Sequence, residues 1–241
     1  MIDVVDLHKS FGDTAVLRGA SFSAAPGTMT ALVGANGSGK TTTLHVLAGL
    51  TAPDAGTARV DGVDVTTDRS AAQERLVFLP QDVRFHEALT PRQVLRFYAG
   101  LRPDPREEAS RPPSRMRDAP AHRLDPLLDQ VALADAAGDP CGTLSGGMRQ
   151  RLGIAVLELA DAPVLLLDEP ALSLDPEWRT FLMERLRARA DAGAAVLLAT
   201  HLVDVWGPLA DQVLRCDNGG MREVEPSAGS VASVDESARA V

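Results

Sequence analysis

Residues 34–42 read GANGSGKTT and fit the pattern G-x-x-x-x-G-K-[ST]. The apolar stretch 28–34, TMTALVG, reads as a strand before them, and 40–50, KTTTLHVLAGL, has helical spacing after them. A glycine-rich turn between a strand and a helix presents successive backbone N–H groups to an anion, and the helix dipole adds to the attraction. The stretch therefore predicts a phosphate-binding loop in an α/β fold, rather than a chance glycine-rich turn.

Two side chains of this loop carry its chemistry. Lys40 would reach the β- and γ-phosphates of a nucleotide, and the Thr41 hydroxyl would ligate Mg²⁺. Lys40 is informative because the chain has only one other lysine, Lys9, and otherwise uses arginine. The other loop residues expected to bind the nucleotide are Gly34, Asn36, Gly37, Ser38, Gly39 and Thr42.

Composition limits the class of protein. The chain has 241 residues, a net charge of −9 and a sequence pI of about 5.0, which disfavours a nucleic-acid partner gathered by bulk electrostatics. Cys141 and Cys216 are far apart in the sequence, so neither a disulfide framework nor a zinc site is expected. We expect the protein to occur in a reducing cytosol. The N-terminus lacks a signal pattern, and the longest apolar runs, 164–167 and 194–198, are of strand length. We expect a soluble chain.

Hydrophobic periodicity and turn signals assign the secondary structure. Expected strands occupy residues 2–7, 16–24, 28–34, 57–65, 75–82, 163–169 and 194–201. Expected helices occupy residues 40–50, 89–101, 125–137, 144–160 and 177–193. Thr90 should cap the second helix with Pro91 at its first position, and Gly193 should end the last.

This order of elements implies two parts and a tail. The strand-rich core should comprise about residues 1–82 and 163–220, with a helical part at about 83–162 between them. Residues 102–120 are rich in proline and charge and read as a loop. Residues 227–241 are polar and predicted to be disordered.

Four polar residues end the buried strands, where α/β proteins bind ligands. Asp168 suits Mg²⁺, and Glu169 could polarise a water for in-line attack on the γ-phosphorus. His201 could hydrogen-bond the γ-phosphate, and the amide of Gln81 could touch Mg²⁺ or the attacking water. Each also has an ordinary reading as a strand-end or turn residue. Phe11 could stack on adenine or be a core aromatic.

Together these motifs resemble one family. GANGSGKTT, LPQ (79–81), LSGGMRQR (144–151), VLLLDEP (164–170), SLD (173–175) and His201 have the order and spacing found in ABC ATPases, over about residues 1–220. The resemblance implies an ABC ATPase domain over about residues 1–226. Its fold would be α/β, of the P-loop NTPase (RecA-like) type: a mixed sheet core, an antiparallel β subdomain and an α-helical signature-motif subdomain.

The resemblance also implies roles for individual residues, with ATP and Mg²⁺ as ligands. Two such domains pair head to tail, as a homodimer or with a paralogue, and Ser145, Gly146 and Gly147 of one cover the ATP bound in the other. Asp175 would cross the interface. Phe11 takes the adenine-stacking position. The catalytic set would be Glu169, His201, Gln81 and Lys40, and the metal set Thr41, Gln81 and Asp168.

The task implied by the resemblance is transport. The chain would drive a separate membrane permease, whose cytoplasmic helix would dock on residues 83–100, and would lie on the inner face of the membrane through that partner. Residues 78–101 look most like exporter-type (ABC-2) ATPases. RFHEALT (84–90) is also similar to ATPases for copper-enzyme maturation, such as that of nitrous-oxide reductase. A non-transport ABC ATPase is the further alternative, and nucleic acid is not expected as a partner.

Overall fold

The computed structural model describes residues 1–101 and 121–225 and divides them into two units. The first unit comprises Met1–Gln81, Ala162–Pro170 and the described residues from Thr180 onward. The second comprises Asp82–Asp161, within its described part, and Ala171–Arg179. The sequence places 171–179 with the core, whereas these residues group with the helical unit. The predicted loop 102–120 and tail 227–241 lie outside the described residues.

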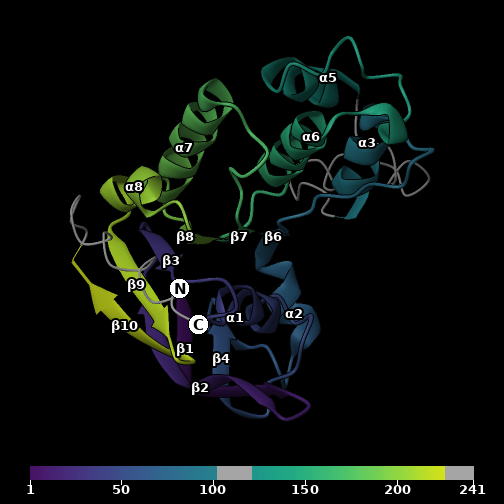
Figure 1. The fold of residues 1–241 in the computed structure, drawn as a ribbon. Coiled ribbons are helices and arrows are strands. Elements are labelled where there is room, and N and C mark those ends of the chain that lie inside the picture. Colours follow the sequence, from purple (N-terminus) through teal and green to yellow (C-terminus); the bar gives the residue numbers. More distant parts are fainter. Residues whose placement is uncertain (102–120, 226–241) are drawn as a thin grey trace. The chain divides into compact units, whose positions relative to one another are not determined.

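A six-stranded sheet forms the centre of the first unit, in the order β10-β9-β3-β8-β7-β6 (Figure 1). Its strands are β3 (Met29–Val33), β6 (Leu76–Leu79), β7 (Val164–Asp168), β8 (Ala195–Thr200), β9 (Gln212–Asp217) and β10 (Gly220–Val224). All neighbours are parallel except β9 and β10. Every residue of β3, β7 and β8 is buried, which explains their continuous apolar sequences.

A second sheet of the first unit is antiparallel and has the order β2-β1-β4-β5. Its strands are β1 (Ile2–Phe11), β2 (Thr14–Ala24), β4 (Ala55–Val60) and β5 (Val63–Asp64). Helix α1 (Lys40–Leu47) packs on β2 and β4 of this sheet and on β7 and β8 of the other. Its residues Leu44, Val46 and Leu47 therefore join a core that includes strands of both sheets. The mixed sheet and the antiparallel sheet confirm the predicted fold class.

Three shorter segments and one long helix complete the first unit. They are α2 (Arg69–Glu74), α8 (Val203–Trp206), the 3-10 turn Gly207–Leu209 and α7 (Pro176–Asp191), whose first turn belongs to the second unit. Gly193, at φ 103°, follows α7 and provides the left-handed residue that ends it, as predicted.

The second unit is helical: α3 (Pro91–Leu101), α5 (Ala121–Gln130), the 3-10 turn Cys141–Thr143 and α6 (Gly146–Leu159). The predicted cap of α3 is confirmed. The Thr90 hydroxyl accepts the Gln93 N–H (3.3 Å), while the Gln93 side chain accepts the Thr90 N–H (2.9 Å), which makes a capping box.

Some boundaries differ from the prediction. Helix α5 covers 121–130 rather than 125–137, because Ala132 turns the chain with φ 48° and the Leu133 N–H bonds back to the Leu128 carbonyl. The sequence prediction also missed α2, α8, β9 and β10. Among the helices in the described parts of the chain, none has the length and apolar character needed to cross a membrane.

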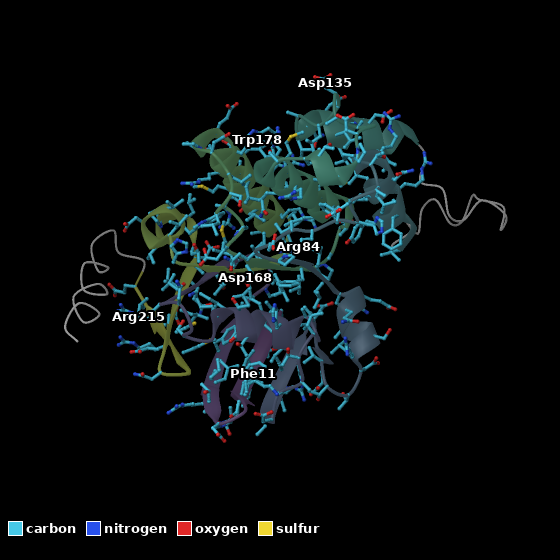
Figure 2. All side chains as sticks on the ribbon, turned by 45° about the vertical axis from the view of Figure 1, so that its right-hand side comes forward. Phe11, Arg84, Asp135, Asp168, Trp178 and Arg215 are labelled. Atoms are coloured by element: carbon cyan, nitrogen blue, oxygen red, sulfur yellow. The ribbon has the colours of Figure 1, made fainter. Side chains whose placement is uncertain are left out.

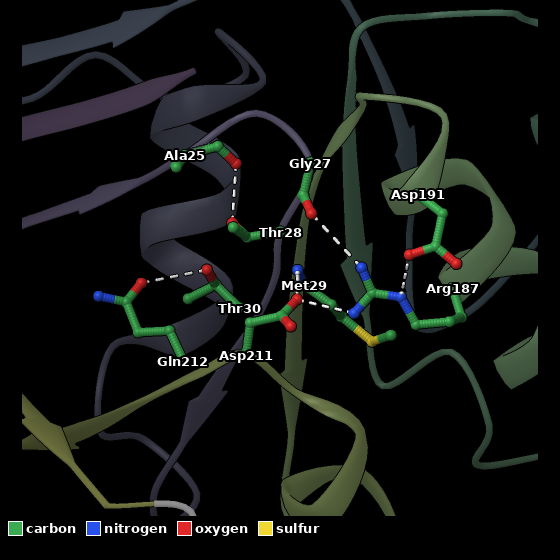
Figure 3. Close-up of polar contacts among 9 residues, drawn as sticks. All are labelled: Ala25, Gly27, Thr28, Met29, Thr30, Arg187, Asp191, Asp211 and Gln212. Carbon is green, nitrogen blue, oxygen red and sulfur yellow. Dashed lines mark hydrogen bonds and ion pairs between the residues drawn. The ribbon is translucent and has the colours of Figure 1, made fainter.

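Arg187 and Asp211 fasten the amino-terminal edge of the large sheet (Figure 3). One oxygen of Asp211 accepts both the Met29 N–H at the start of β3 (2.7 Å) and the Arg187 guanidinium of α7 (2.7 Å). Arg187 also donates to Asp191 (2.9 Å) and to the Gly27 carbonyl (3.4 Å). Burial alone raises the pKa of Asp211, but the bonds from Met29 and Arg187 outweigh it, so the pKa lies below its ordinary value.

We predict that Asp211→Asn lowers the free energy of unfolding by about 1 kcal/mol at pH 7, because the charged hydrogen bonds are weakened at a partly exposed site. The folded pKa is depressed, so the stabilisation is complete above the unfolded pKa of about 4 and is lost as pH falls below it. Urea unfolding between pH 7 and pH 3.5 measures the difference. Asp191→Asn, which removes only an exposed partner of Arg187, serves as the control and should change stability little. A pH-independent difference for Asp211→Asn would contradict the assignment.

Candidate nucleotide-binding site

The register of the parallel strands brings the predicted site residues to one edge of the large sheet. Val33 pairs with Thr200, so the loop from Gly34 and the following His201 leave neighbouring strands at the same level. Asp168 pairs with Ala199, one residue earlier on the same strand.

Glu169 and Gln81 come after the ends of β7 and β6, which are the next two neighbouring strands of the sheet. Leu167 pairs with Leu79, so each of these two polar residues stands two positions beyond a paired leucine. The sequence prediction that all four strand-end residues share one edge therefore agrees with the strand pairing.

The phosphate loop is held in shape by Lys40 and by the backbone conformation of Gly39. Lys40 is buried, and its Nζ atom donates to the carbonyls of Gly34 (2.8 Å) and Ala35 (3.0 Å). Gly39 has φ 105°, and a Cβ atom there would lie 2.7 Å from the Leu17 side chain. A glycine is needed at this position because the backbone is left-handed and the neighbouring strand is too close for a side chain.

Asp168, labelled in Figure 2, ends β7 and is only 2% exposed. Burial raises the pKa of this carboxyl above its ordinary value, a hydrogen bond from Thr41 opposes that shift, and the charge of Glu169 adds to it. Its Oδ1 atom is buried without a hydrogen-bond partner in the described structure, as is the hydroxyl of Ser38 in the loop. Buried polar atoms of this kind are costly unless a ligand satisfies them.

These oxygen atoms fit Mg²⁺. The ion prefers hard oxygen ligands and is commonly bound by one or two carboxylates together with substrate phosphates. Thr41 and Asp168 already lie within hydrogen-bond distance of each other, and Oδ1 of Asp168 stays available. Across residues 1–101 and 121–225, no three His, Cys, Asp or Glu side chains gather into a metal-binding group. Phosphate oxygens would therefore supply much of the coordination.

The side chains of Glu169 and His201 contact each other next to Asp168. Nδ1 of His201 lies 2.8 Å from Oε1 of Glu169, and the glutamate side chain is only 9% exposed whereas the histidine is 46% exposed. Glu169 comes after the end of β7 in a left-handed conformation, φ 44°, and its N–H bonds to the Ala199 carbonyl (2.9 Å). The direction of its side chain is thus set by this strained turn. Strain of this kind is characteristic of functional positions.

Gln81 and Phe11 are both exposed. Gln81 ends the first unit after Pro80, and the Phe11 ring, labelled in Figure 2, is 53% exposed at the end of β1. The alternative that Phe11 is a core aromatic is therefore wrong.

In the second unit, Ser145, Gly146 and Gly147 form the amino terminus of α6. The Ser145 hydroxyl caps the helix by accepting the Met148 N–H (3.2 Å). A Cβ atom at Gly146 would meet nothing within 4 Å, whereas one at Gly147 would lie 3.2 Å from the Ser173 carbonyl. The helix end thus presents accessible N–H groups and the positive end of a dipole, which can bind an anion.

The charged residues that follow support this helix end. Arg149 donates to the Leu144 carbonyl (3.0 Å). Arg151 donates to the Val131 carbonyl (3.1 Å), and its guanidinium lies 4.7 Å from the centroid of the Trp178 ring. Asp175 caps α7 by accepting the Trp178 N–H (3.0 Å), a structural role that the sequence prediction did not include.

Sequence reasoning missed His45 as a neighbour of the site. It follows Thr41 by one helical turn, packs edge-on against the Phe78 ring of β6 at 5.7 Å, and its charge lowers the pKa of Asp168. The spacing of four residues from Thr41 is the signal that could have indicated it.

Comparison with known proteins identifies relatives of the chain. The family described as ABC transporter matches residues 17–172. A Nod factor export ATP-binding protein I of Ralstonia nicotianae is 36% identical over 91% of this chain and 65% of its own length, so the chain spans just under two thirds of that relative. A solved ATP-binding subunit of an ABC transporter is 27% identical, with a TM-score of 0.81 over 93% of this chain and 90% of that one. A dimeric ATP-binding cassette bound to ADP and Pi, 21% identical, has the same fold, with a TM-score of 0.79 over 94% and 99% of the two chains.

We predict that Asp168→Asn raises the free energy of unfolding of the nucleotide-free protein by about 1 kcal/mol, because it removes a buried charge that lacks a full set of partners. The same change should abolish the additional stabilisation that Mg²⁺ gives to the ATP-bound protein. Urea unfolding with ATP, with and without Mg²⁺, measures both effects. Asp217→Asn is the matched control, since Asp217 is an exposed aspartate at the end of β9, and it should change neither quantity. A destabilised nucleotide-free variant that kept its Mg²⁺ response would contradict the prediction.

Proposed function

The chain belongs to the ABC transporter family, and from this we propose that it is the ATP-hydrolysing subunit of an exporter. The observation that carries the proposal is the Glu169–His201 pair at the same sheet edge as Lys40 and Asp168. A nearly buried carboxylate beside a phosphate loop is suited to accept the proton of an attacking water.

The side chains divide the work of hydrolysis. The N–H groups of the loop and Lys40 bind the phosphates, and Lys40 exchanges its contacts with the Gly34 and Ala35 carbonyls for them. Thr41 and Asp168 would hold Mg²⁺, with Gln81 as the third predicted ligand; the ion neutralises charge on the phosphate oxygens. Glu169 polarises the water, and His201 orients Glu169 and donates to the γ-phosphate.

The amino terminus of α6 supplies the second half of each site in a pair of chains. Gly146 has space for the close approach of a phosphate, and the capped helix end offers N–H groups for it. We assign this contact to the ATP of a partner protomer, with Asp175 crossing between the two. The dimeric cassette bound to ADP and Pi, which has the same fold, is consistent with such a pair.

The exposed face of α3 is the proposed contact for the permease. Phe97 and Leu101 are 59% and 60% exposed, and Tyr98 packs edge-on against Phe97 at 5.5 Å between ring centroids. Apolar side chains gathered on one helix in this way favour a protein partner. Phe97 and Tyr98 lie within the segment 83–100 that is predicted to contact the permease, and Leu101 directly follows it. These side chains could pack against the apolar face of a cytoplasmic helix from a membrane subunit.

Export is the proposed direction, because the Nod factor export ATP-binding proteins, which are 36% identical to this chain over the aligned residues, are named for export. The proposed location follows from the permease: the cytoplasmic side of the membrane, held there by the partner. The cargo is a property of the permease and is best identified by purifying the chain from membranes together with that subunit.

We predict that Glu169→Gln binds Mg·ATP with unchanged affinity but releases phosphate at least about 100-fold more slowly, because the group that activates water is lost. The variant should accumulate as an ATP-bound dimer in light scattering. Glu184→Gln, a change at an exposed glutamate of α7, should hydrolyse ATP at the wild-type rate. Wild-type turnover by Glu169→Gln would exclude it as the base.

The accumulated dimer also tests the contribution of α6 in trans. Adding Gly146→Asp to the Glu169→Gln chain should prevent pairing through charge repulsion with the phosphate, while the monomer still binds ATP. Loss of ATP binding by the monomer would instead place Gly146 in the site of its own chain.

We predict that the double change Phe97→Ser and Leu101→Ser reduces recovery of the permease with the chain from membranes by about 10-fold, because exposed apolar anchors carry much of an interface's free energy. The unfolding midpoint should stay unchanged, since both side chains are exposed. Leu50→Ser, at an exposed leucine of the first unit, is the control and should not affect recovery. Undiminished recovery with the double variant would reject α3 as the contact.

A further inference from the structure

Lys9 is the only lysine besides Lys40, and it lies beside the ring of Phe11, which is predicted to stack on adenine. Its Nζ atom is 5.4 Å from the centroid of Phe11 and over the ring. The two residues are two apart on β1, and the pairing of β1 with β2 is irregular between Lys9 and Ser10. The Lys9 side chain is only 15% exposed despite its charge.

Asp54 holds Lys9 in this place through contacts at the end of β1. Its Oδ1 accepts the Lys9 ammonium (2.8 Å), and its Oδ2 accepts the Ser10 N–H (2.6 Å). The Asp54 N–H donates to the His8 carbonyl (2.9 Å). The segment before β4 is therefore tied to three consecutive residues ahead of Phe11.

The same part of the sheet adjoins the phosphate loop. Lys9 pairs with Leu17 across β1 and β2, and the Leu17 side chain is the one that a Cβ atom at Gly39 would strike. Phe11 thus lies at the end of a strand that is connected to the loop through the Lys9–Leu17 pair, and the residue is 53% exposed although the Lys9 ammonium lies over its ring.

We propose that Lys9 is a positioning residue for the nucleotide base: its ammonium, fixed by Asp54, covers one face of the Phe11 ring and leaves the other face for adenine. The inference rests on the proposed ATP site. A cation over one face is attracted by the ring quadrupole, which restrains the ring and makes its opposite face less negative. Both effects favour stacking on the electron-rich face of adenine.

The effect should be modest and specific to the base. A cation–π contact at an exposed site corresponds to a change in affinity of about two- to fivefold. It should be lost when the ligand has phosphates but no base. A Lys9–Asp54 pair that merely fastened β1 to the segment before β4 would instead affect both kinds of ligand, or stability alone.

The test compares Mg·ATP with Mg·tripolyphosphate by titration calorimetry on the whole chain. Lys9→Met keeps the length of the side chain and removes its charge, and it should raise the Kd for ATP by about two- to fivefold with no change for tripolyphosphate. Lys9→Arg should restore the wild-type Kd. In a Phe11→Ala background Lys9→Met should have no further effect, because the ring through which it acts is gone.

Controls keep each outcome decisive. Asp61→Asn disrupts another ion pair of the first unit, between the β4–β5 turn and Arg75 at the end of α2, and should leave both affinities unchanged. If Lys9→Met fails to fold, Asp54→Asn tests the same contact while keeping an acceptor for Ser10. Equal weakening of both ligands, or an undiminished effect in Phe11→Ala, overturns the inference while ATP binding stands. A wild-type chain that binds no ATP overturns the proposed function itself.

Discussion

Parallel pairing of four neighbouring strands is the constraint on which the site depends. Because β3, β8, β7 and β6 run in the same direction and in register, their carboxyl ends meet at one edge. Residues far apart in the chain, such as Gly34 and His201, become neighbours without any direct bond between them. The apolar strands therefore organise the chemistry as well as the core, since a slip of one residue would turn every side chain to the other face.

Strand pairing also explains how much could be predicted. Continuous apolar runs and glycine signals identified the central strands, and the motif at 34–42 located the phosphate loop. The end of α5 was missed because Ala132 adopts a left-handed conformation that is usually taken by glycine or asparagine. The hairpin β9–β10 was missed although Asn218 and Gly219 form its turn, because two neighbouring apolar residues (213–214) and two neighbouring charged residues (222–223) break the alternation in the flanking strands.

The site itself was predictable in its residue types but not in its local geometry. The sequence VLLLDE does not indicate that Glu169 has φ 44° after the end of the strand. It also does not indicate that Nδ1 of His201 lies 2.8 Å from Oε1 of Glu169. Nor does it indicate that Oδ1 of Asp168 is buried without a partner. These features oppose folding stability, and they occur where ligand binding can offset their cost.

The position of β3 within its sheet has a consequence for synthesis on the ribosome. This strand ends at Val33, yet its two neighbours, β8 and β9, begin only at Ala195 and Gln212. Until those segments leave the exit tunnel, a strand whose residues are all buried in the folded protein has both edges open to other nascent chains. The antiparallel hairpin of β1 and β2 can close early, but the sheet that bears the nucleotide loop is completed only after β9 and β10 have been synthesised.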